Sequence, residues 1–198
     1  MTPDALLDAW FGPPADDATV FARQMPRWFG GGPEVDAALQ ASFGALLEPG
    51  AVMGVARWAT TPRGRLAAIL VFDQLGRNIH RGTPRAFALD PWARALAREA
   101  VEQRLDEKLT VPERLFCWLP FEHSEDPDDQ ALSVRLFTRL AEQAPGPLRG
   151  VTARLLDYAR RHAEIVERFG RFPHRNAILG RPSTEEELGF LQTPGSSF

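Results

Sequence analysis

The strongest constraint on the fold is a long repeat of helical period in residues 151–172, where steps of four and three place seven side chains on one helix face. The seven are Val151, Leu155, Tyr158, His162, Ile165, Phe169 and Phe172. Six are apolar or aromatic, but His162 needs a partner, because burying a polar group without one costs roughly 2–7 kcal/mol. We therefore expect His162 to be mostly buried and hydrogen-bonded to a carboxylate, that of Glu122 or Asp73.

Other segments of helical period predict an all-α fold. We expect helices over residues 3–11, 33–47, 52–60, 63–75, 132–140 and 185–191, and further helices beginning near residues 90 and 110, whereas residues 21–29 form an aromatic-rich segment ended by glycines. The most hydrophobic segment, 63–75, could also be a buried strand, but Leu66, Ile69 and Asp73 share one helical face. About eight helices, short loops and no hairpin signal indicate a single helical domain over residues 1–198.

Local signals predict several helix ends. Gly76 is expected to end the helix of 63–75 and open a polar, arginine-containing loop. Asp90, followed by a proline, is expected to be an N-cap, and Thr110 with Glu113 has the spacing of a capping box. Pro120 is expected to break or kink the helix that follows this box.

The composition excludes several classes of protein. A formal charge of −3 over 198 residues gives no general attraction to nucleic acid or to an anionic membrane. No run of about 18 apolar residues is present, and the N-terminus lacks the pattern of a signal peptide, so we expect a soluble, cytoplasmic protein. The single cysteine, Cys117, lies among apolar residues and is expected to be a packing residue rather than a nucleophile. The tail, 193–198, is expected to be loosely held.

Three long motifs carry a resemblance to a known family. They are FDQLGRNIHRGTPRAFALD at 72–90, LPFEHSEDPDDQ at 119–130 and HAEIVERFGRFPHRNAILGRPSTEEELGFL at 162–191. With these motifs the chain resembles, over nearly its whole length, a bacterial family catalogued as domain of unknown function 924. The resemblance implies a tetratricopeptide-like stack of antiparallel helix pairs and implies no reaction. Because relatives often carry an aromatic residue at the position of His80, the resemblance also argues against an essential role for His80.

Ionisable residues end three of the apolar helix faces, which predicts a polar site inside the core. Two arginine-rich segments, one after Phe72 and one after Phe169, are expected to come together there and form one anion-binding pocket. The candidate catalytic residues are Glu122, His162 and His174, and the candidate ligand-binding residues are Asp73, Arg77, His123, Arg171, Arg175 and Asn176. The alternative is a satisfied buried network that only fixes helix packing, with carboxylates neutralising the arginines.

Metal-ligand spacing is weak in this sequence. Glu122, His123, Glu125, His162 and His174 are suitable ligand types, but no His-Glu-x-x-His or Glu-x-x-His pattern is present. No metal and no cofactor are therefore expected.

Two functions remain open from the sequence. The first is binding or transformation of a small anionic molecule by general acid/base chemistry in a closed polar pocket. The second is a helical protein-interaction scaffold that holds a peptide in an open groove.

Overall fold

The computed structural model describes residues 1–196, and these form helices and connecting turns with no β-strand. The α-helices are α1 Pro3–Phe11, α2 Asp17–Phe29, α3 Pro33–Phe43, α4 Pro49–Ala56, α5 Pro62–Ile69, α6 Gly76–Ile79, α7 Asp90–Glu102, α8 Val111–Glu122, α9 Pro127–Gln143, α10 Arg149–Phe169 and α11 Glu185–Leu191. The structure has more helices than the eight or so expected, because several short helices lie between the long ones. The shorter turns are η1 Gly44–Leu47, η2 Leu70–Leu75, η3 Pro84–Phe87, η4 Asp106–Lys108, η5 Gly146–Leu148 and η6 Pro173–Arg175.

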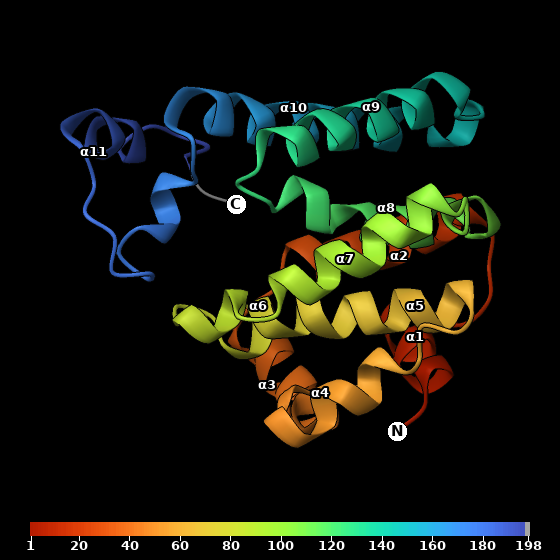
Figure 1. The fold of residues 1–198 in the computed structure, drawn as a ribbon. Helices are drawn as coiled ribbons and strands as arrows, with labels where there is room; N and C mark the ends of the chain where they lie inside the picture. Colours follow the sequence, from red (N-terminus) through yellow and green to blue (C-terminus); the bar gives the residue numbers. More distant parts are fainter. Residues whose placement is uncertain (197–198) are drawn as a thin grey trace.

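The main hydrophobic core joins α1 through α10. Leu66, Phe72, Phe116 and Phe137 are all fully buried in it, so α5, η2, α8 and α9 share one interior. The α9 and α10 helices form an antiparallel pair across the top of the molecule in Figure 1. One all-helical domain results, whereas the tetratricopeptide-like stacking of helix pairs stays a prediction.

Several helices have the ends that the sequence predicts. Thr110 and Glu113 form the expected capping box at the start of α8, and Thr184 forms another at the start of α11. The face of α10 is largely buried as expected, but Tyr158 is half-exposed. The α10 helix ends at Gly170, whose positive φ of 67° is the left-handed conformation of a C-cap.

The prediction that Gly76 ends the helix of 63–75 was wrong. The chain passes from α5 into the π-helical turn η2 and then directly into α6, with Gly76 itself in right-handed helical conformation. Gly76 serves close packing instead, because a Cβ placed on it would lie 3.2 Å from the carbonyl oxygen of Ala86.

Two further local predictions were wrong. Asp90 does not cap α7; the N-cap position is Leu89, and no side chain bonds the helix start there. Pro120 does not break α8, which continues to Glu122, and a kink at Pro120 stays a prediction. The expected helix of 52–60 lies earlier, as α4, because Pro49 occupies its first turn.

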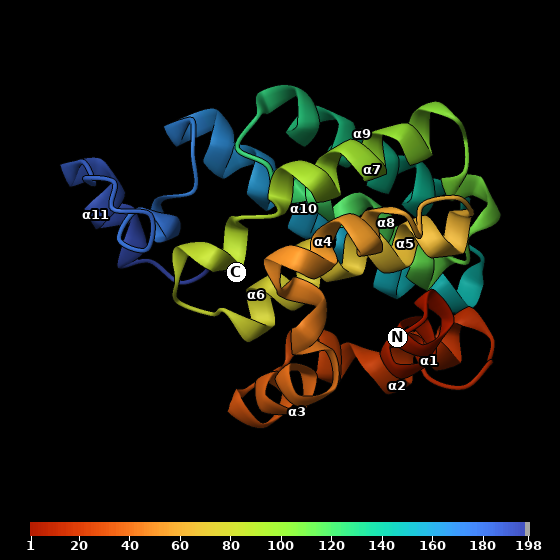
Figure 2. The same cartoon turned by 60° about the horizontal axis from the view of Figure 1, so that its bottom comes forward.

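The C-terminal part lies at one end of the molecule. Figures 1 and 2 both place α11 there, beyond the η6 turn. Ile165, Val166 and Phe172 form a second, small apolar cluster that supports this end. The predicted loose tail falls partly on residues 197–198, which lie outside the described residues; before them, Ser196 donates a hydrogen bond to the Leu191 carbonyl. Within the described part of the chain, every helix is too short or too polar to cross a lipid bilayer.

Candidate functional site

A cavity of about 740 Å³ lies between α2, α6, α8, α10 and the η6 turn. This volume falls in the range of about 300–1,000 Å³ that is typical of small-molecule sites. Its polar residues include Gln74, Arg77, Asn78, Glu122, His123, His162, His174 and Arg175. Its apolar residues include Met25, Trp28, Phe29, Leu115, Leu119, Leu155 and Ile178. The cavity is therefore amphipathic, with charged groups and a large apolar lining.

The π-helical turn η2 positions the first carboxylate of the site. Its extra residue per turn is a feature that often accompanies functional sites in helices. Asp73 in this turn is 1% exposed and accepts a hydrogen bond of 2.6 Å from the Nε2 of its neighbour Gln74. One turn later, Arg77 Nη1 lies 3.0 Å from Asp73 Oδ1.

Arg77 links the buried carboxylate of Asp73 to the partly buried carboxylate of Asp90. Its Nη1 and Nη2 atoms donate to Asp90 Oδ1 and Oδ2 at 2.8 and 2.9 Å, a bidentate pair. Burial opposes ionisation of Asp73, but Arg77 and His123 outweigh it and hold the pKa of Asp73 well below its usual value. Burial raises the pKa of Asp90 despite the contact with Arg77. Arg77 is thus neutralised by protein groups and is a structural bridge in this state.

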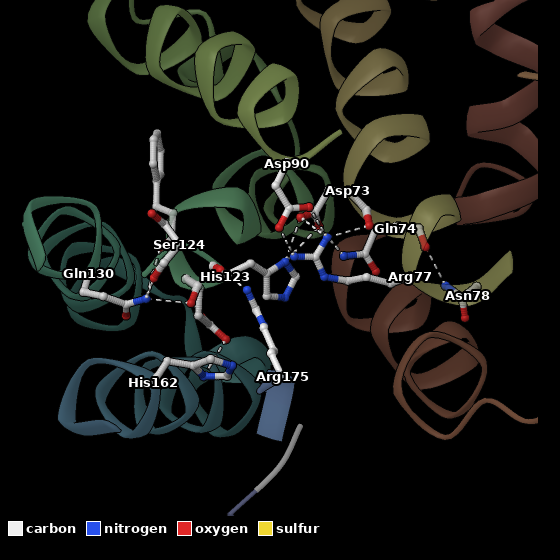
Figure 3. Close-up of polar contacts among 12 residues, drawn as sticks. Asp73, Gln74, Arg77, Asn78, Asp90, His123, Ser124, Gln130, His162 and Arg175 are labelled. Atoms are coloured by element: carbon white, nitrogen blue, oxygen red, sulfur yellow. Dashed lines mark hydrogen bonds and ion pairs between the residues drawn. The ribbon is translucent and has the colours of Figure 1, made fainter. Parts of the chain in front are cut away.

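His123, the C-cap of α8, lies against the same carboxylate. Its Nδ1 is 2.8 Å from Asp73 Oδ1 and 3.0 Å from Oδ2. Burial and the positive charge of Arg77 lower the pKa of His123, although Asp73 acts in the opposite direction. The neutral ring therefore donates from Nδ1 to Asp73, and this fixes its tautomer. Figure 3 shows the ring between the Asp73–Arg77–Asp90 cluster and Arg175.

Glu122 and His162 form a second buried contact on the opposite side of His123. They are 5% and 4% exposed, and His162 Nδ1 lies 3.2 Å from Glu122 Oε1. Burial and the charge of Asp73 raise the pKa of Glu122 to about 8, and burial lowers the pKa of His162 to about 3. Both groups are therefore neutral near pH 7.

The prediction for His162 was right in burial and in its carboxyl neighbour. Its Nδ1 lies 3.2 Å from Glu122 Oε1 and makes a shorter contact, of 2.9 Å, with the carbonyl oxygen of Tyr158 one turn earlier. The helix backbone thus shares with Glu122 a ring nitrogen that we expected a carboxylate to satisfy.

Arg175 differs from the other arginines of the two predicted segments. The residue is 7% exposed. Its guanidinium lies 4.4 Å from the ring centre of Phe172 and 4.8 Å from that of Phe87, and it donates from Nη1 to the carbonyl of His123 at 2.9 Å. Among the described residues no carboxylate forms an ion pair with it, and its buried Nε has no hydrogen-bond partner. Burial, together with the charge of Arg77, lowers the pKa of Arg175 to about 10.

The two predicted arginine-rich segments do meet, since Arg77 and Arg175 line the same cavity. His174 also lines it, and burial with the charge of Arg175 lowers the His174 pKa to about 4. Arg171 does not line the cavity, because it binds Glu187 in a bidentate pair. The cavity is thus lined by Arg77 and Arg81 of the first segment and by His174 and Arg175 of the second, and Arg81 is paired with Asp36.

Asn176 was also expected at the site and does not reach it. Its Nδ2 donates to Ser183, and its Oδ1 accepts from Arg181, so it holds the turn after η6 together. Arg181 in turn forms a bidentate pair with Glu125, which also accepts from the Phe172 backbone amide. Sequence spacing gave no means to separate these internal pairs from ligand-binding arginines.

Several residues of the site were not expected. Asp90 was interpreted as a cap, and Phe87, Trp28 and Phe29 carried no signal beyond their hydrophobicity. Only the fold shows that Phe87 covers one face of Arg175 and that the aromatic residues at the end of α2 line the apolar part.

No group of three or more His, Cys, Asp or Glu side chains in the described part of the chain is arranged to hold a metal ion. Cys117 is buried, and burial raises its thiol pKa, which agrees with a packing residue.

A purely structural network accounts for part of the site. Asp73, Arg77 and Asp90 satisfy one another and join η2, α6 and α7. It does not account for Arg175, a buried cation without a counter-ion among the described residues, nor for the second ring nitrogen of His123.

Comparisons with known proteins agree with the architecture. The family model described as a bacterial protein of unknown function, DUF924, matches residues 6–195. A solved structure titled as a protein of unknown function, ATU0120 from Agrobacterium tumefaciens, is 33% identical, with 96% of each chain covered and a TM-score of 0.78. A search of curated proteins found no match.

Proposed function

The chain belongs to the DUF924 family of bacterial proteins, and for this member we propose that the cavity binds a small organic anion with an apolar body. The observation that carries the proposal is the buried guanidinium of Arg175, which has no carboxylate partner in residues 1–196.

A buried charge without a counter-ion is costly, and proteins usually pair such charges or use them. Arg175 is held rigidly, because Phe87 and Phe172 stack on it and the His123 carbonyl accepts one of its protons. Its remaining donors are therefore preorganised, and a carboxylate or phosphate group would supply the missing negative charge with charge-assisted hydrogen bonds.

The apolar part of the cavity defines the rest of the ligand. Trp28, Leu115, Leu119 and Leu155 line it, and Phe29 and Tyr158, both about half-exposed, also border it. An inorganic ion would leave this surface unfilled, whereas an acyl or aromatic group would bury it at about 25 cal/mol per Å². We therefore expect medium-chain carboxylates or alkyl phosphates to bind better than inorganic phosphate.

The scaffold alternative predicts that the same surface binds extended peptides. A cavity with a buried cation favours a small ligand, because a peptide groove needs backbone partners along its length. Peptides belong in the same binding panel for this reason.

The test is a thermal-shift panel with octanoate, octyl phosphate, inorganic phosphate, octanol and an unrelated peptide. The two amphipathic anions should raise the melting temperature by roughly 5–10 °C at a concentration of about 100 Kd, from about 2.7 kcal/mol of linkage. Octanol and inorganic phosphate should have much smaller effects.

Two variants test whether the anion binds at Arg175. Arg175→Gln should fold and lose most of the shift, whereas Arg168→Gln should keep it, because Arg168 is an exposed arginine that pairs with Glu186 outside the cavity. Equal shifts in both variants, or a peptide-only response, would remove the basis for an anion site.

A further inference from the structure

We propose that the cavity is also catalytic, and that His123, positioned by Asp73, is a general base that activates water to hydrolyse an acyl ester in the bound anion. This inference rests on the proposed anion site, because Arg175 would hold the carboxylate or phosphate of the substrate next to His123.

The geometry of His123 is that of a base rather than a structural histidine. The Nδ1–H group of His123 donates a hydrogen bond of 2.8 Å to Asp73 Oδ1, so the lone pair of the neutral ring is on Nε2. Nε2 has no hydrogen-bond partner among residues 1–196, and the side chain borders the cavity. A fixed, neutral imidazole with its free nitrogen beside a ligand is the arrangement that general-base catalysis requires.

The groups around His123 keep it neutral while still supporting the protonated form that appears during reaction. Arg77 and Arg175 are the cations that face it, from α6 and η6, and His162 faces it from α10 with ring centres 6.3 Å apart. Asp73 is the carboxylate that contacts it within residues 1–196, and this carboxylate stabilises an imidazolium once a proton arrives.

Glu122 supplies the complementary proton donor. It precedes His123 in α8, borders the same cavity, and is 5% exposed. Its carboxyl group contacts the neutral ring of His162 and pairs with no cation among the described residues. A carboxyl group in such surroundings keeps its proton near pH 7, as burial raises its pKa to about 8.

The reaction needs water and no other co-reactant. His123 Nε2 removes a proton from water while the oxygen bonds to the ester carbonyl carbon, giving a tetrahedral intermediate. The carbon–oxygen bond to the leaving group then breaks with its electron pair, and the leaving oxygen takes the proton of Glu122. The proton on His123 passes to solvent or to Glu122, and a carboxylic acid and an alcohol leave.

Two esters with the same acyl chain test the two roles separately. In 4-(octanoyloxy)benzoate the leaving group is a phenolate, which departs without a proton, whereas in (octanoyloxy)acetate it is an alkoxide, which needs one. Release of octanoate by purified protein is measured by chromatography for each ester. Binding of each ester is measured independently by thermal shift.

Wild-type protein should hydrolyse both esters. His123→Asn retains a donor for Asp73 and lacks Nε2, and it should lower kcat at least 100-fold for both esters with KM little changed. Glu122→Gln should lower kcat for (octanoyloxy)acetate at least tenfold more than for the benzoate. Asp73→Asn, which acts through His123, should lower kcat and shift the imidazole titration seen by NMR.

The outcomes separate the two proposals. Esters that bind through Arg175 but release no octanoate, or an active His123→Asn variant, overturn the catalytic inference and leave the anion site intact. Esters that do not raise the melting temperature overturn the anion site and this inference with it. Circular dichroism of each variant shows that loss of activity is not loss of folding.

Discussion

Substitution of Glu122 by Gln should change how stability depends on pH. In the folded protein, burial and the negative charge of Asp73 raise the Glu122 pKa to about 8, whereas the ordinary value is 4.5. Between these pH values the folded state holds one proton more than the unfolded state. Stability must therefore fall as pH rises through this window, by about 1.4 kcal/mol per pH unit.

The buried histidines also change how the free energy of unfolding depends on pH. His162 and His174 have folded pKa values of about 3 and about 4, below the ordinary 6.5. Their unfolded forms take up protons below pH 6.5, so their contribution to stability rises with pH and then becomes constant. Between pH 6.5 and 7.5 the histidines still offset part of the slope due to Glu122, so this slope is measured against Glu122→Gln, which carries the same histidines.

The magnitude is large enough to measure. Relative to Glu122→Gln, which stays neutral at this position, wild-type protein should lose about 1.2 kcal/mol of unfolding free energy between pH 6.5 and 7.5. Urea unfolding followed by circular dichroism at four pH values in this window gives both curves. Parallel curves for the two proteins would show that Glu122 is already ionised and would refute the reasoning.

Three other substitutions test the network and its packing. Arg77→Gln removes the cation from buried Asp73, which keeps its contacts with His123 and Gln74, and from partly buried Asp90, and should cost about 3 kcal/mol in urea unfolding; a cost below about 1 kcal/mol would mean that these carboxylates are solvated. Cys117→Ala should lower stability by about 1 kcal/mol and leave the octanoate-induced thermal shift unchanged; loss of the shift would assign the thiol a role in binding. Gly76→Ala places a Cβ against the Ala86 carbonyl and should lower the free energy of unfolding by about 1–3 kcal/mol, seen as a lower melting temperature. An unchanged melting temperature would show that the η3 turn can move to make room for the added methyl group.

The sequence predicted the helical architecture well because helical period and capping are local properties. The capping box of Thr110 and Glu113 and the long helix ending at Gly170 follow from residues a few positions apart. The continuation of the helix through Gly76 was missed, because tight packing against a distant turn outweighs the low helix propensity of glycine.

The candidate site was predicted only in part, since its members are chosen by long-range pairing. Asp90 has the local pattern of an N-cap, yet Arg77, 13 residues earlier, binds its carboxylate. Arg171 and Arg175 lie in the same arginine-rich segment, and the sequence pattern does not distinguish them. In the structure Glu187 neutralises Arg171, whereas Arg175 lines the cavity. Which arginine lacks a partner depends on the whole fold.

The central claim is that Arg175 receives the anionic group of a ligand whose apolar body fills the cavity. The most direct test is a crystal structure of the protein with 8-bromooctanoate, in which anomalous scattering locates the bromine. The account predicts a carboxylate within hydrogen-bond distance of Arg175 and bromine among Trp28, Leu115 and Leu155. A carboxylate bound away from Arg175, or bromine found only on the outer surface, would contradict it.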